Sequence, residues 1–526
     1  MKLSFLIRLF AGSVLLARAF AAEPITAGTS NKAEHILVIV WDGMRPDFIA
    51  PQYTPTLYQL AREGVFFKNH HPVYISSTEV NGTALATGMY PNHSGIMANS
   101  DYRPEIGWLG PAGTESVDAI RRGDLLTDGH YLAVPTLAEI LQQAGHRTAV
   151  AGTKPVVLLH DRSLKRTSPV AISSVNLYKG RAIPSAALDA LVKVNDDKQF
   201  PGTNTHPNTA QDAWTTKALT HGLWKKGVPK LSVLWLSEPD SSQHETGPGS
   251  DTSIAALESV DKRLADVLKA LEEKKVRDKT DIFIVSDHGF STIQRGPNIA
   301  ETLKKAKFKA TRKFEDPEPG DVMVVGLGGS VLFYVIEQDE EVIRKLVEFL
   351  QASDFAGVIF SRLPLDGTFP LSQVRIDTDK TEPDVVVSLR WSADKNEFGT
   401  PGLLIGDDGK KGKGTHGSLS RFDMHNTLVA AGPDLRHGFI SELPSGNADL
   451  VPTILWILGI EPPQRMDGRI LTEALEGHPA GAPKAEQKTI EASTEHGLFR
   501  WRQYLKFSTV GESIYFDEGN GEAVRK

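Results

Sequence analysis

Three largely apolar segments of the chain are each followed, after one to three residues, by an aspartic acid. The segments are residues 36–40, 231–236 and 281–285, and the acids that follow them are Asp42, Asp240 and Asp287. A continuous apolar run such as residues 36–40 is typical of a strand that is buried on both faces of a parallel sheet. Because the carboxyl ends of parallel strands share one edge of the sheet, the three acids should converge there. Carboxylates that gather in a buried place need a cation to offset their charge.

Helical and strand-like segments alternate along most of the chain. The expected helix 210–223 leads into the second apolar strand, and the expected helix 253–274 leads into the third. This alternation predicts an α/β fold with a mostly parallel central sheet and helices on both faces. The expected units are a first part of the core at 33–300, a smaller α+β insertion at 301–400, a second part of the core at 401–475, and a small C-terminal antiparallel sheet at 489–526.

Composition excludes several classes of protein and site. The 526 residues include no cysteine and carry a formal net charge of −7. Without cysteine there can be no disulfide, no thiolate zinc site and no cysteine nucleophile. The acidic balance provides no basic surface for a polyanion, so we do not expect binding to a nucleic-acid duplex.

The N-terminus has the pattern of a signal peptide over residues 1–22. Lys2 and Arg8 precede a mostly apolar stretch at 9–20, and small residues then fit a cleavage site. The alternative is an apolar anchor helix, but Arg18 interrupts the stretch, which is shorter than the ~20 residues that a span requires. We therefore expect a protein exported to the periplasm or secreted, with no transmembrane segment after the leader is removed.

Three histidines accompany the acids at the strand ends. His244 lies four residues after Asp240, His288 directly follows Asp287, and His416 belongs to a glycine-rich loop. A lone histidine in such a loop is more commonly a surface residue. Together, carboxylates and imidazoles suit zinc, with manganese or iron possible, and argue against calcium, which prefers oxygen ligands. The set is large enough to hold two metal ions.

A candidate nucleophile lies in the segment 76–91, which begins with three hydroxyl residues and continues with small helix-forming residues. The hydroxyls belong to Ser76, Ser77 and Thr78. One interpretation is that a hydroxyl at the start of a helix is simply an N-cap. The same position also presents free backbone N–H groups to a phosphate, and a neighbouring metal ion would make the hydroxyl a strong nucleophile.

Taken together, these motifs resemble the type I phosphodiesterase/nucleotide pyrophosphatase family of the alkaline phosphatase superfamily. The resemblance covers residues 35–475 and is carried by Asp42-Gly43 with Arg45, by the segment 87–96, by Glu238-Pro239-Asp240 with His244, by Ser286-Asp287-His288-Gly289 and by Gly414-Thr415-His416-Gly417. It implies an alkaline-phosphatase-like core. It also implies metal-dependent hydrolysis of a small-molecule phosphoester, most of all a phosphodiester.

The resemblance assigns roles to individual residues. It implies one zinc ion bound by Asp42, Thr78, Asp287 and His288, and a second bound by Asp240, His244 and His416. Thr78 corresponds to the nucleophile, which would form a phosphothreonine intermediate that water then hydrolyses. Asn81 corresponds to an asparagine that donates a hydrogen bond to a phosphoryl oxygen.

Two residues leave the identity of the substrate open: Glu79, directly after the expected nucleophile, and Lys154, after the expected strand 148–151. Glu79 stands where members that cleave nucleotides have an aromatic residue stacked on the base. It could repel polyanions and favour a cationic head group, or be a solvated or structural acid. Lys154 could bind a second anionic group of the substrate, as in phosphonate-cleaving relatives, or be an ordinary loop lysine.

Several alternative functions remain. A phosphonate hydrolase of the phosphonoacetate type or a phosphomonoesterase would use the same site. A sulfatase is disfavoured because residues 76–80 lack the proline and arginine of its maturation motif. A cofactor-independent phosphoglycerate mutase would be cytosolic and would normally use serine. A non-catalytic binding module is disfavoured because no expected metal ligand and no expected nucleophile is missing from the sequence.

The sequence leaves open the leaving group, the metal that is bound in vivo, the oligomeric state and the role of residues 301–400.

Overall fold

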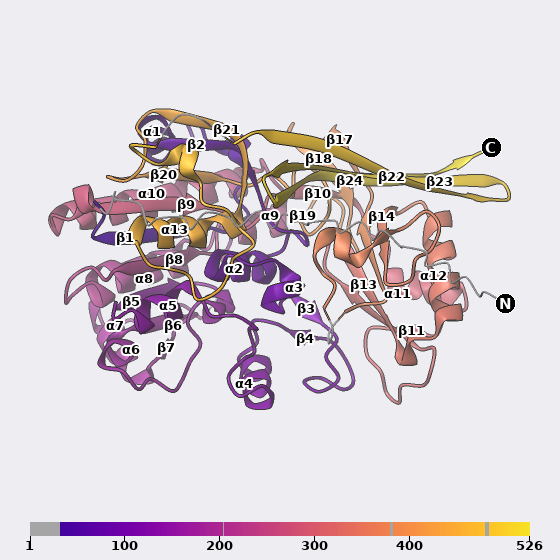
Figure 1. Ribbon diagram of the computed structural model, residues 1–526, viewed down its shortest axis with the longest axis horizontal. Helices are drawn as coiled ribbons and strands as arrows, with labels where there is room; N and C mark the ends of the chain where they lie inside the picture. The colour runs from indigo at the N-terminus through magenta and orange to yellow at the C-terminus, as the bar shows by residue number, and fades with distance from the viewer. Residues whose placement is uncertain (1–31, 203–204, 379–381, 479–482) are drawn as a thin grey trace, which may run out of the picture.

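A computed structural model describes residues 32–202, 205–378, 382–478 and 483–526. Its centre is a nine-stranded sheet (Figure 1). In spatial order the strands are β21 (Phe439–Gly446), β2 (Val65–His71), β20 (Leu428–Ala431), β9 (Thr280–Val285), β1 (His35–Trp41), β8 (Leu231–Leu236), β5 (Thr148–Gly152), β6 (Val175–Tyr178) and β7 (Arg181–Ile183).

The three apolar segments that carry the acids are neighbouring parallel strands. β1 lies between β8 and β9 and pairs in parallel with both, with Ile36 opposite Leu231 and Asp281. The same parallel direction continues through β5 and β6. β20 runs antiparallel between β9 and β2, and β7 is antiparallel to β6. The sheet is therefore mostly parallel, as expected.

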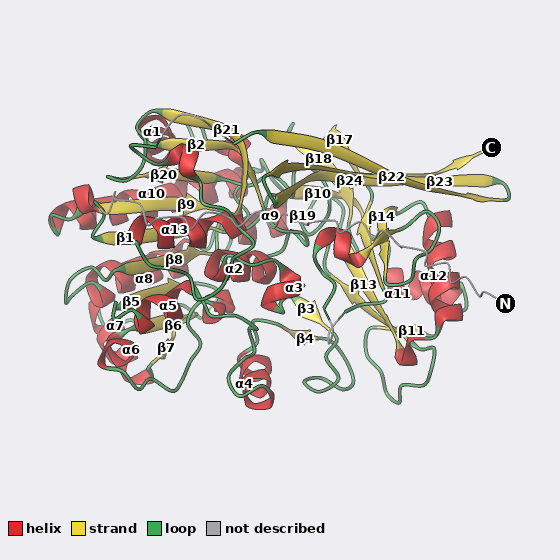
Figure 2. Ribbon diagram, viewed as in Figure 1, coloured by secondary structure: helices red, strands yellow, loops and turns green. Residues whose placement is uncertain are grey.

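Helices cover both faces of this sheet (Figure 2). On one face, alternate residues of β1 pack with α2 (Thr78–Thr87), α5 (Leu137–Gln143) and α13 (Leu450–Leu458). On the other face, the intervening residues pack with α1 (Pro55–Glu63), α8 (Thr209–Lys217) and α10 (Asp251–Glu273). Because every second side chain of a strand points to the opposite face, a strand between two helical layers must be apolar throughout.

A smaller α+β part contains a six-stranded sheet. Its strands, in spatial order, are β11 (Ala310–Thr311), β12 (Val322–Gly326), β13 (Ser330–Val335), β16 (Val385–Leu389), β14 (Ala356–Ser361) and β15 (Phe369–Pro370). The helices α11 (Ile299–Lys305) and α12 (Glu340–Ala352) pack against it. A four-stranded sheet of β17 (Trp391–Lys395), β18 (Pro401–Ile405), β10 (Ser291–Arg295) and β19 (Gly414–Thr415) was not foreseen.

The C-terminal sheet is antiparallel and has three long strands. They are β22 (Ala485–His496), β23 (Phe499–Val510) and β24 (Ser513–Arg525). The first strand begins four residues before the expected boundary at 489, because exposed polar residues from Ala485 onward pair in register with the end of β23. An exposed edge strand of this composition cannot be told from a linker by its sequence pattern.

The remaining α-helices and strands are short. They are α3 (Pro91–Ser94), α4 (Val117–Leu126), α6 (Pro169–Ser173), α7 (Leu188–Val194), α9 (Asp240–Thr246), β3 (Ser100–Asp101) and β4 (Ala112–Gly113). Within the described part of the chain, no helix has the length and apolarity needed to cross a membrane.

Candidate active site

Three buried acids meet at the carboxyl edge of the central sheet. Asp42 follows β1, Asp240 opens α9 after β8, and Asp287 follows β9. Gly43 holds the turn after β1 with a φ of +71°, and a Cβ there would lie 3.0 Å from Phe290 and 3.1 Å from Asp240. Its backbone N–H donates to Oδ1 of Asp287 at 2.9 Å. Only glycine permits this close approach of two strand ends.

Each of the three histidines is oriented by a backbone carbonyl. Nδ1 of His244 lies 3.1 Å from the Gly414 oxygen, Nδ1 of His288 lies 2.9 Å from the Gly289 oxygen, and Nδ1 of His416 lies 2.9 Å from the Ser76 oxygen. Because a carbonyl only accepts, each Nδ1 carries the proton and donates it. In the neutral form of each ring, Nε2 then has a lone pair free for a cation.

The free Nε2 atoms face the carboxylates. In His244, Nε2 lies 3.2 Å from Oδ1 of Asp240, and in His416 it lies 3.6 Å from the same oxygen. In His288, Nε2 lies 3.2 Å from Oδ2 of Asp287 and 3.6 Å from Oδ1 of Asp42. The structure thus gathers all six Asp and His residues that the sequence singled out.

Two groups of these residues have the compactness of a metal site. One contains Asp240, His244 and His416, and the other contains Asp42, Asp240 and His288, with ligand atoms within 4.8 Å of one another in each group. The first group is the set expected for the second zinc ion. In the second group Asp240 occurs where the resemblance implied Asp287, so Asp240 belongs to both groups.

The donor atoms fit metal ions. Oδ1 of Asp42, Oδ1 of Asp240 and Oδ2 of Asp287 are buried and have no hydrogen-bond partner within the described residues. Burial also lowers the pKa of His288 and lowers that of His416 well below the ordinary value, which favours neutral imidazoles. A carboxylate oxygen facing an unprotonated Nε2 is a contact between two acceptors, and a cation between them removes the conflict.

Lys154 lies among the same acids. Its Nζ is 2.9 Å from Oδ2 of Asp42 and 3.0 Å from Oδ2 of Asp240. Although burial by itself would lower the pKa of Lys154, the carboxylates of Asp240 and Asp42 raise it well above the ordinary value. The second oxygen of Asp42 is also held by Nε1 of Trp235 at 2.8 Å. Lys154 is therefore no ordinary loop lysine, because it neutralises the acids at the centre of the site.

Of the three adjacent hydroxyls, Thr78 lies at the site. Its side chain opens α2 and is buried, with Oγ1 at 3.3 Å from Nε2 of His288. Ser76 instead donates to the Ser418 carbonyl at 2.8 Å. The N-cap residue Ser77 makes no side-chain capping bond. The threonine hydroxyl thus reaches the cluster from the positive end of a ten-residue helix.

The expectation that Asn81 donates to a phosphoryl oxygen does not fit the structure. Its Nδ2 donates to the carbonyls of Val73, Ile75 and Ser77 at 3.0, 3.3 and 3.1 Å. Its Oδ1 accepts from the Val73 N–H at 2.7 Å and from Nδ2 of Asn447 at 3.0 Å. Both amide hydrogens are committed and the side chain is fully buried. Asn81 therefore fixes the loop that precedes the nucleophile.

The side chain of Asn99 was not singled out from the sequence, yet it lies at the start of α2. Its Oδ1 accepts from the Glu79 N–H at 3.1 Å. The residue is half-buried, and its hydrogen bond to Glu79 does not use the amide nitrogen. No motif pointed to it, because it lies in an irregular segment 21 residues after Thr78. The bond to the Glu79 N–H holds the Asn99 side chain at the first turn of the helix that Thr78 opens.

Glu79 is a buried acid and not a solvated one. The residue is 6% exposed, and the carboxyl group of Glu115 is a near neighbour. Burial and the neighbouring charge of Glu115 raise the pKa of Glu79 well above its ordinary value. Two neighbouring carboxyl groups in a buried place cannot both be ionised at low cost. No aromatic ring therefore occupies the position next to the nucleophile.

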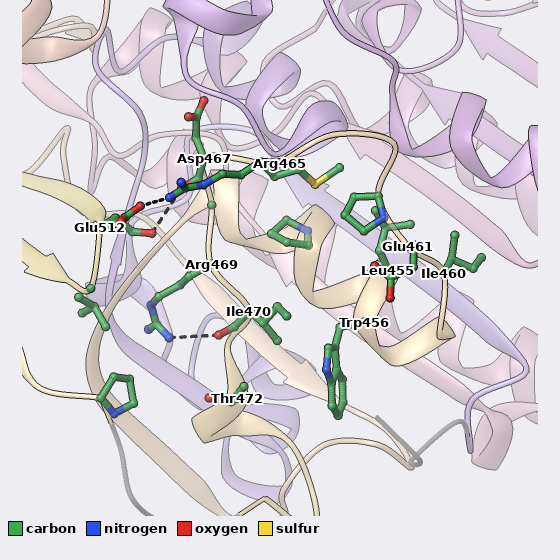
Figure 3. Close-up of a pocket in the computed structure, with 18 of the residues that line it drawn as sticks. Leu455, Trp456, Ile460, Glu461, Arg465, Asp467, Arg469, Ile470, Thr472 and Glu512 are labelled. Carbon is green, nitrogen blue, oxygen red and sulfur yellow. Dashed lines mark hydrogen bonds and ion pairs between the residues drawn. The ribbon is translucent and has the colours of Figure 1, made fainter. Parts of the chain in front are cut away.

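Of two cavities in the structure, one is lined by candidate site residues and the other is not. One of about 290 Å³ opens directly beside Lys154, Asp240 and His244. A larger, mostly apolar cavity of about 670 Å³ is lined by residues such as Leu455 and Trp456 (Figure 3). None of the candidate site residues lines the larger cavity, so its size does not connect it with the chemistry.

A comparison with models of known protein families shows the family to which this chain belongs. The family model described as type I phosphodiesterase/nucleotide pyrophosphatase matches residues 36–394, which include six of the seven candidate metal ligands. The chain belongs to the type I phosphodiesterase/nucleotide pyrophosphatase family. It is an enzyme of the class that hydrolyses phosphate esters. The remaining candidate ligand, His416, lies beyond the matched residues and is joined to them by the contacts described above.

Curated members of the family are distant relatives of this chain. It is 24% identical over 442 residues to the bis(5'-adenosyl)-triphosphatase enpp4 of Xenopus laevis, which covers 82% of this chain and 79% of the relative. It is 23% identical over 447 residues to human ectonucleotide pyrophosphatase/phosphodiesterase family member 5, with 81% and 75% covered. The structure of murine ectonucleotide pyrophosphatase/phosphodiesterase 5 matches with a TM-score of 0.59 at 18% identity, over 84% of this chain and 100% of that one.

The different environments of Asn81 and Asn99 lead to opposite expectations for their alanine variants in this family member. Asn81→Ala leaves buried carbonyls of the loop without donors, so we expect the free energy of unfolding to fall by about 1–3 kcal/mol or more. Asn99→Ala should lower kcat/KM by ~10²-fold, as the loss of one donor to a charged transition state does. Its stability should change by less than ~1 kcal/mol.

Denaturant unfolding and turnover of an aryl phosphodiester, measured on both variants, check this pair. Asn99→Gln is the matched control, because it keeps the amide and displaces it by one methylene. A fully stable Asn81→Ala variant with strongly reduced turnover would restore Asn81 as the donor.

Proposed function

We propose that this protein hydrolyses phosphate esters, most of all phosphodiesters, with Thr78 as the nucleophile and two zinc ions as cofactors. The observation that carries the proposal is the position of Thr78. Its Oγ1 lies at a helix N-terminus, 3.3 Å from Nε2 of His288, at the sheet edge where buried carboxylate oxygens lack partners. Manganese or iron would suit the same ligands.

Seven residues would hold the metal ions. Asp42, Thr78, Asp287 and His288 would hold one ion, and Asp240, His244 and His416 the other, with Asp240 near enough to contribute to both. Bound there, zinc supplies Lewis-acid stabilisation of the charge that develops on the phosphoryl and departing oxygens. Deprotonated carboxylates and neutral imidazoles are the ligand forms that such binding requires.

The residues of this chain divide the reaction into two displacements. Oγ1 of Thr78 forms a bond to phosphorus as the bond to one alcohol breaks, and that alcohol leaves with a proton. Water then attacks the phosphothreonine, which restores the hydroxyl and releases the phosphorylated remainder. The N-terminus of α2 and the amide of Asn99 would stabilise the phosphoryl oxygens throughout.

A substrate panel tests the reaction class. The zinc-loaded protein should turn over bis-p-nitrophenyl phosphate faster than p-nitrophenyl phosphate, because a diester carries one negative charge less into a site lined by carboxylates. Faster turnover of the monoester, or of phosphonoacetate, would favour the phosphomonoesterase or the phosphonate hydrolase. Absence of turnover with every ester would favour a non-catalytic module.

Glu79 makes a nucleotide the less favoured substrate in this proposal. With a buried acid pair where a stacking ring would be, the position next to Thr78 provides no apolar platform for a base. The name of the Xenopus relative refers to a dinucleotide, but that identity is 24% and the environment of Glu79 is this chain's own. A non-nucleotide diester is therefore the substrate class that we favour.

Export is also proposed, on the sequence pattern of residues 1–22, which lie outside the described residues. We expect the mature chain in its native host to begin near Ala22. N-terminal sequencing of protein from the periplasm or the medium checks this expectation. A cytosolic pool that retains Met1 would contradict it.

A further inference from the structure

Trp235 is a fully buried residue near the carboxyl end of β8, beside the candidate metal ligands. It pairs with Val40 of β1, two residues before Asp42, and with Gly152 of β5. Its Nε1–H donates to Oδ2 of Asp42 at 2.8 Å. An indole has one donor and no acceptor, so this bond uses its whole hydrogen-bonding capacity. The side chain thus makes a directed contact with a candidate metal ligand from within the hydrophobic core.

The two oxygens of the Asp42 carboxylate have different environments. Oδ2 accepts from Trp235 and lies 2.9 Å from Nζ of Lys154. Oδ1 is buried, has no hydrogen-bond partner within the described residues, and lies 3.6 Å from Nε2 of His288. A carboxylate that is hydrogen-bonded through one oxygen is oriented to offer the other oxygen to a cation. The contacts therefore favour Oδ1 as the single ligand atom of Asp42.

Trp235 also contacts the two segments that carry Lys154 and the candidate nucleophile. Its carbonyl accepts from the Thr153 N–H at 3.0 Å, directly before Lys154. Its ring packs against Gly82, one turn along α2 from Thr78, where a Cβ would lie 3.2 Å from Cη2 of the indole. Because the core is close-packed on this side, the ring has no room to turn its N–H away from the carboxylate.

We propose that Trp235 is a positioning residue that selects which oxygen of Asp42 binds the metal ion. The assignment rests on the proposed two-metal function. Trp235 acts through the carboxylate and does not itself bind the ion. Without the N–H the carboxylate would no longer be fixed with Oδ1 toward the other ligands. Loss of such an outer hydrogen bond typically lowers metal affinity by ~10–100-fold.

Trp235→Phe removes the N–H and keeps an aromatic ring in the core. We expect the dissociation constant for zinc, measured by competition with a chelator, to rise ~10-fold or more. Trp224→Phe is the matched control, because Trp224 is also fully buried and donates to Oγ of Ser232 at 2.9 Å. Trp224 packs on the opposite face of the sheet, so its variant should leave the zinc dissociation constant unchanged.

Two further proteins separate positioning from packing. In an Asp42→Ala background, Trp235→Phe should leave the zinc dissociation constant unchanged, because the carboxylate that the indole orients is gone. Benzothienylalanine in place of Trp235 keeps the shape of the ring and replaces its N–H by sulfur. This protein should unfold at the wild-type temperature and lose zinc affinity as Trp235→Phe does.

The outcomes distinguish this assignment from the proposed function. An unchanged zinc dissociation constant in Trp235→Phe and in the benzothienylalanine protein would overturn the role of Trp235 while the two-metal function stands. An equal loss of affinity in the Asp42→Ala background would also overturn it, because the effect would then not pass through the carboxylate. Wild-type protein that binds no zinc would instead refute the proposed function itself.

Discussion

Thr78→Ala should lower kcat by at least ~10³-fold while the protein stays folded. The variant removes the nucleophile and one candidate metal ligand together. Because Oγ1 of Thr78 makes no helix-capping bond and its hydrogen-bond partner is His288, the start of α2 does not depend on it for stability. Single-turnover and steady-state assays with bis-p-nitrophenyl phosphate, together with thermal unfolding, measure both effects.

Ser76→Ala and Ser77→Ala are the matched controls for this variant. Ser76 is bonded to the Ser418 carbonyl, and Ser77 precedes the helix, so neither hydroxyl lies where Thr78 does. Both variants should keep turnover within about tenfold of the wild type. Near-normal turnover in Thr78→Ala together with a large loss in Ser77→Ala would mean that the neighbouring hydroxyl is the nucleophile.

Asp240→Asn should impair both metal sites at once. Asp240 belongs to both compact groups of candidate ligands, with Oδ1 facing His244 and His416 and Oδ2 facing Lys154. The amide that replaces the carboxylate keeps the shape and removes the charge, so affinity for the ions should fall at both places. We expect fewer than about one zinc ion per chain after dialysis, and a loss of kcat of at least ~10³-fold.

Glu245→Gln is the control for that experiment, because Glu245 lies on the same short helix and is ion-paired with Lys413 outside both groups. His244→Gln provides the intermediate case, since His244 belongs to one group. Elemental analysis should find the lowest zinc content in Asp240→Asn, an intermediate content in His244→Gln and the wild-type content in Glu245→Gln. This order follows the number of ligand groups to which each residue belongs. Full zinc content in Asp240→Asn would refute the shared position of this carboxylate.

The candidate site was largely predictable because its ligands are tied to regular structure. Asp42, Asp240 and Asp287 follow neighbouring parallel strands, so the fold itself brings them to one edge. His244 lies one helical turn after Asp240 on α9, and His288 is adjacent to Asp287. The geometry of strands and helices is local and periodic, which is why sequence spacing was sufficient for these residues.

Asn81 shows where reasoning from spacing fails. It lies in the first turn of a helix that is buried along its whole length, so its polar atoms must be satisfied by whatever surrounds them. The nearest groups are the backbone of the preceding loop at Val73 and Ile75 and the side chain of Asn447, which is 366 residues away in the chain. No pattern around residue 81 contains information about that distant partner.

The environment of Glu79 was unpredictable for a similar reason. Its neighbours Asn99 and Glu115 come from irregular segments 20 and 36 residues further along. Hydrophobic periodicity says nothing about the path of such segments. The two alternatives considered from the sequence were substrate discrimination and a solvated or structural acid. Burial beside a second acid excludes the solvated form, and a structural acid and substrate discrimination both remain.

The metal content of the purified wild-type protein tests the central claim most directly. Elemental analysis after zinc loading and removal of free metal should find about two zinc ions per chain. Chelation should abolish turnover of bis-p-nitrophenyl phosphate, and added zinc should restore it. Fewer than one ion per chain in fully active protein, with turnover insensitive to chelators, would contradict the two-metal account.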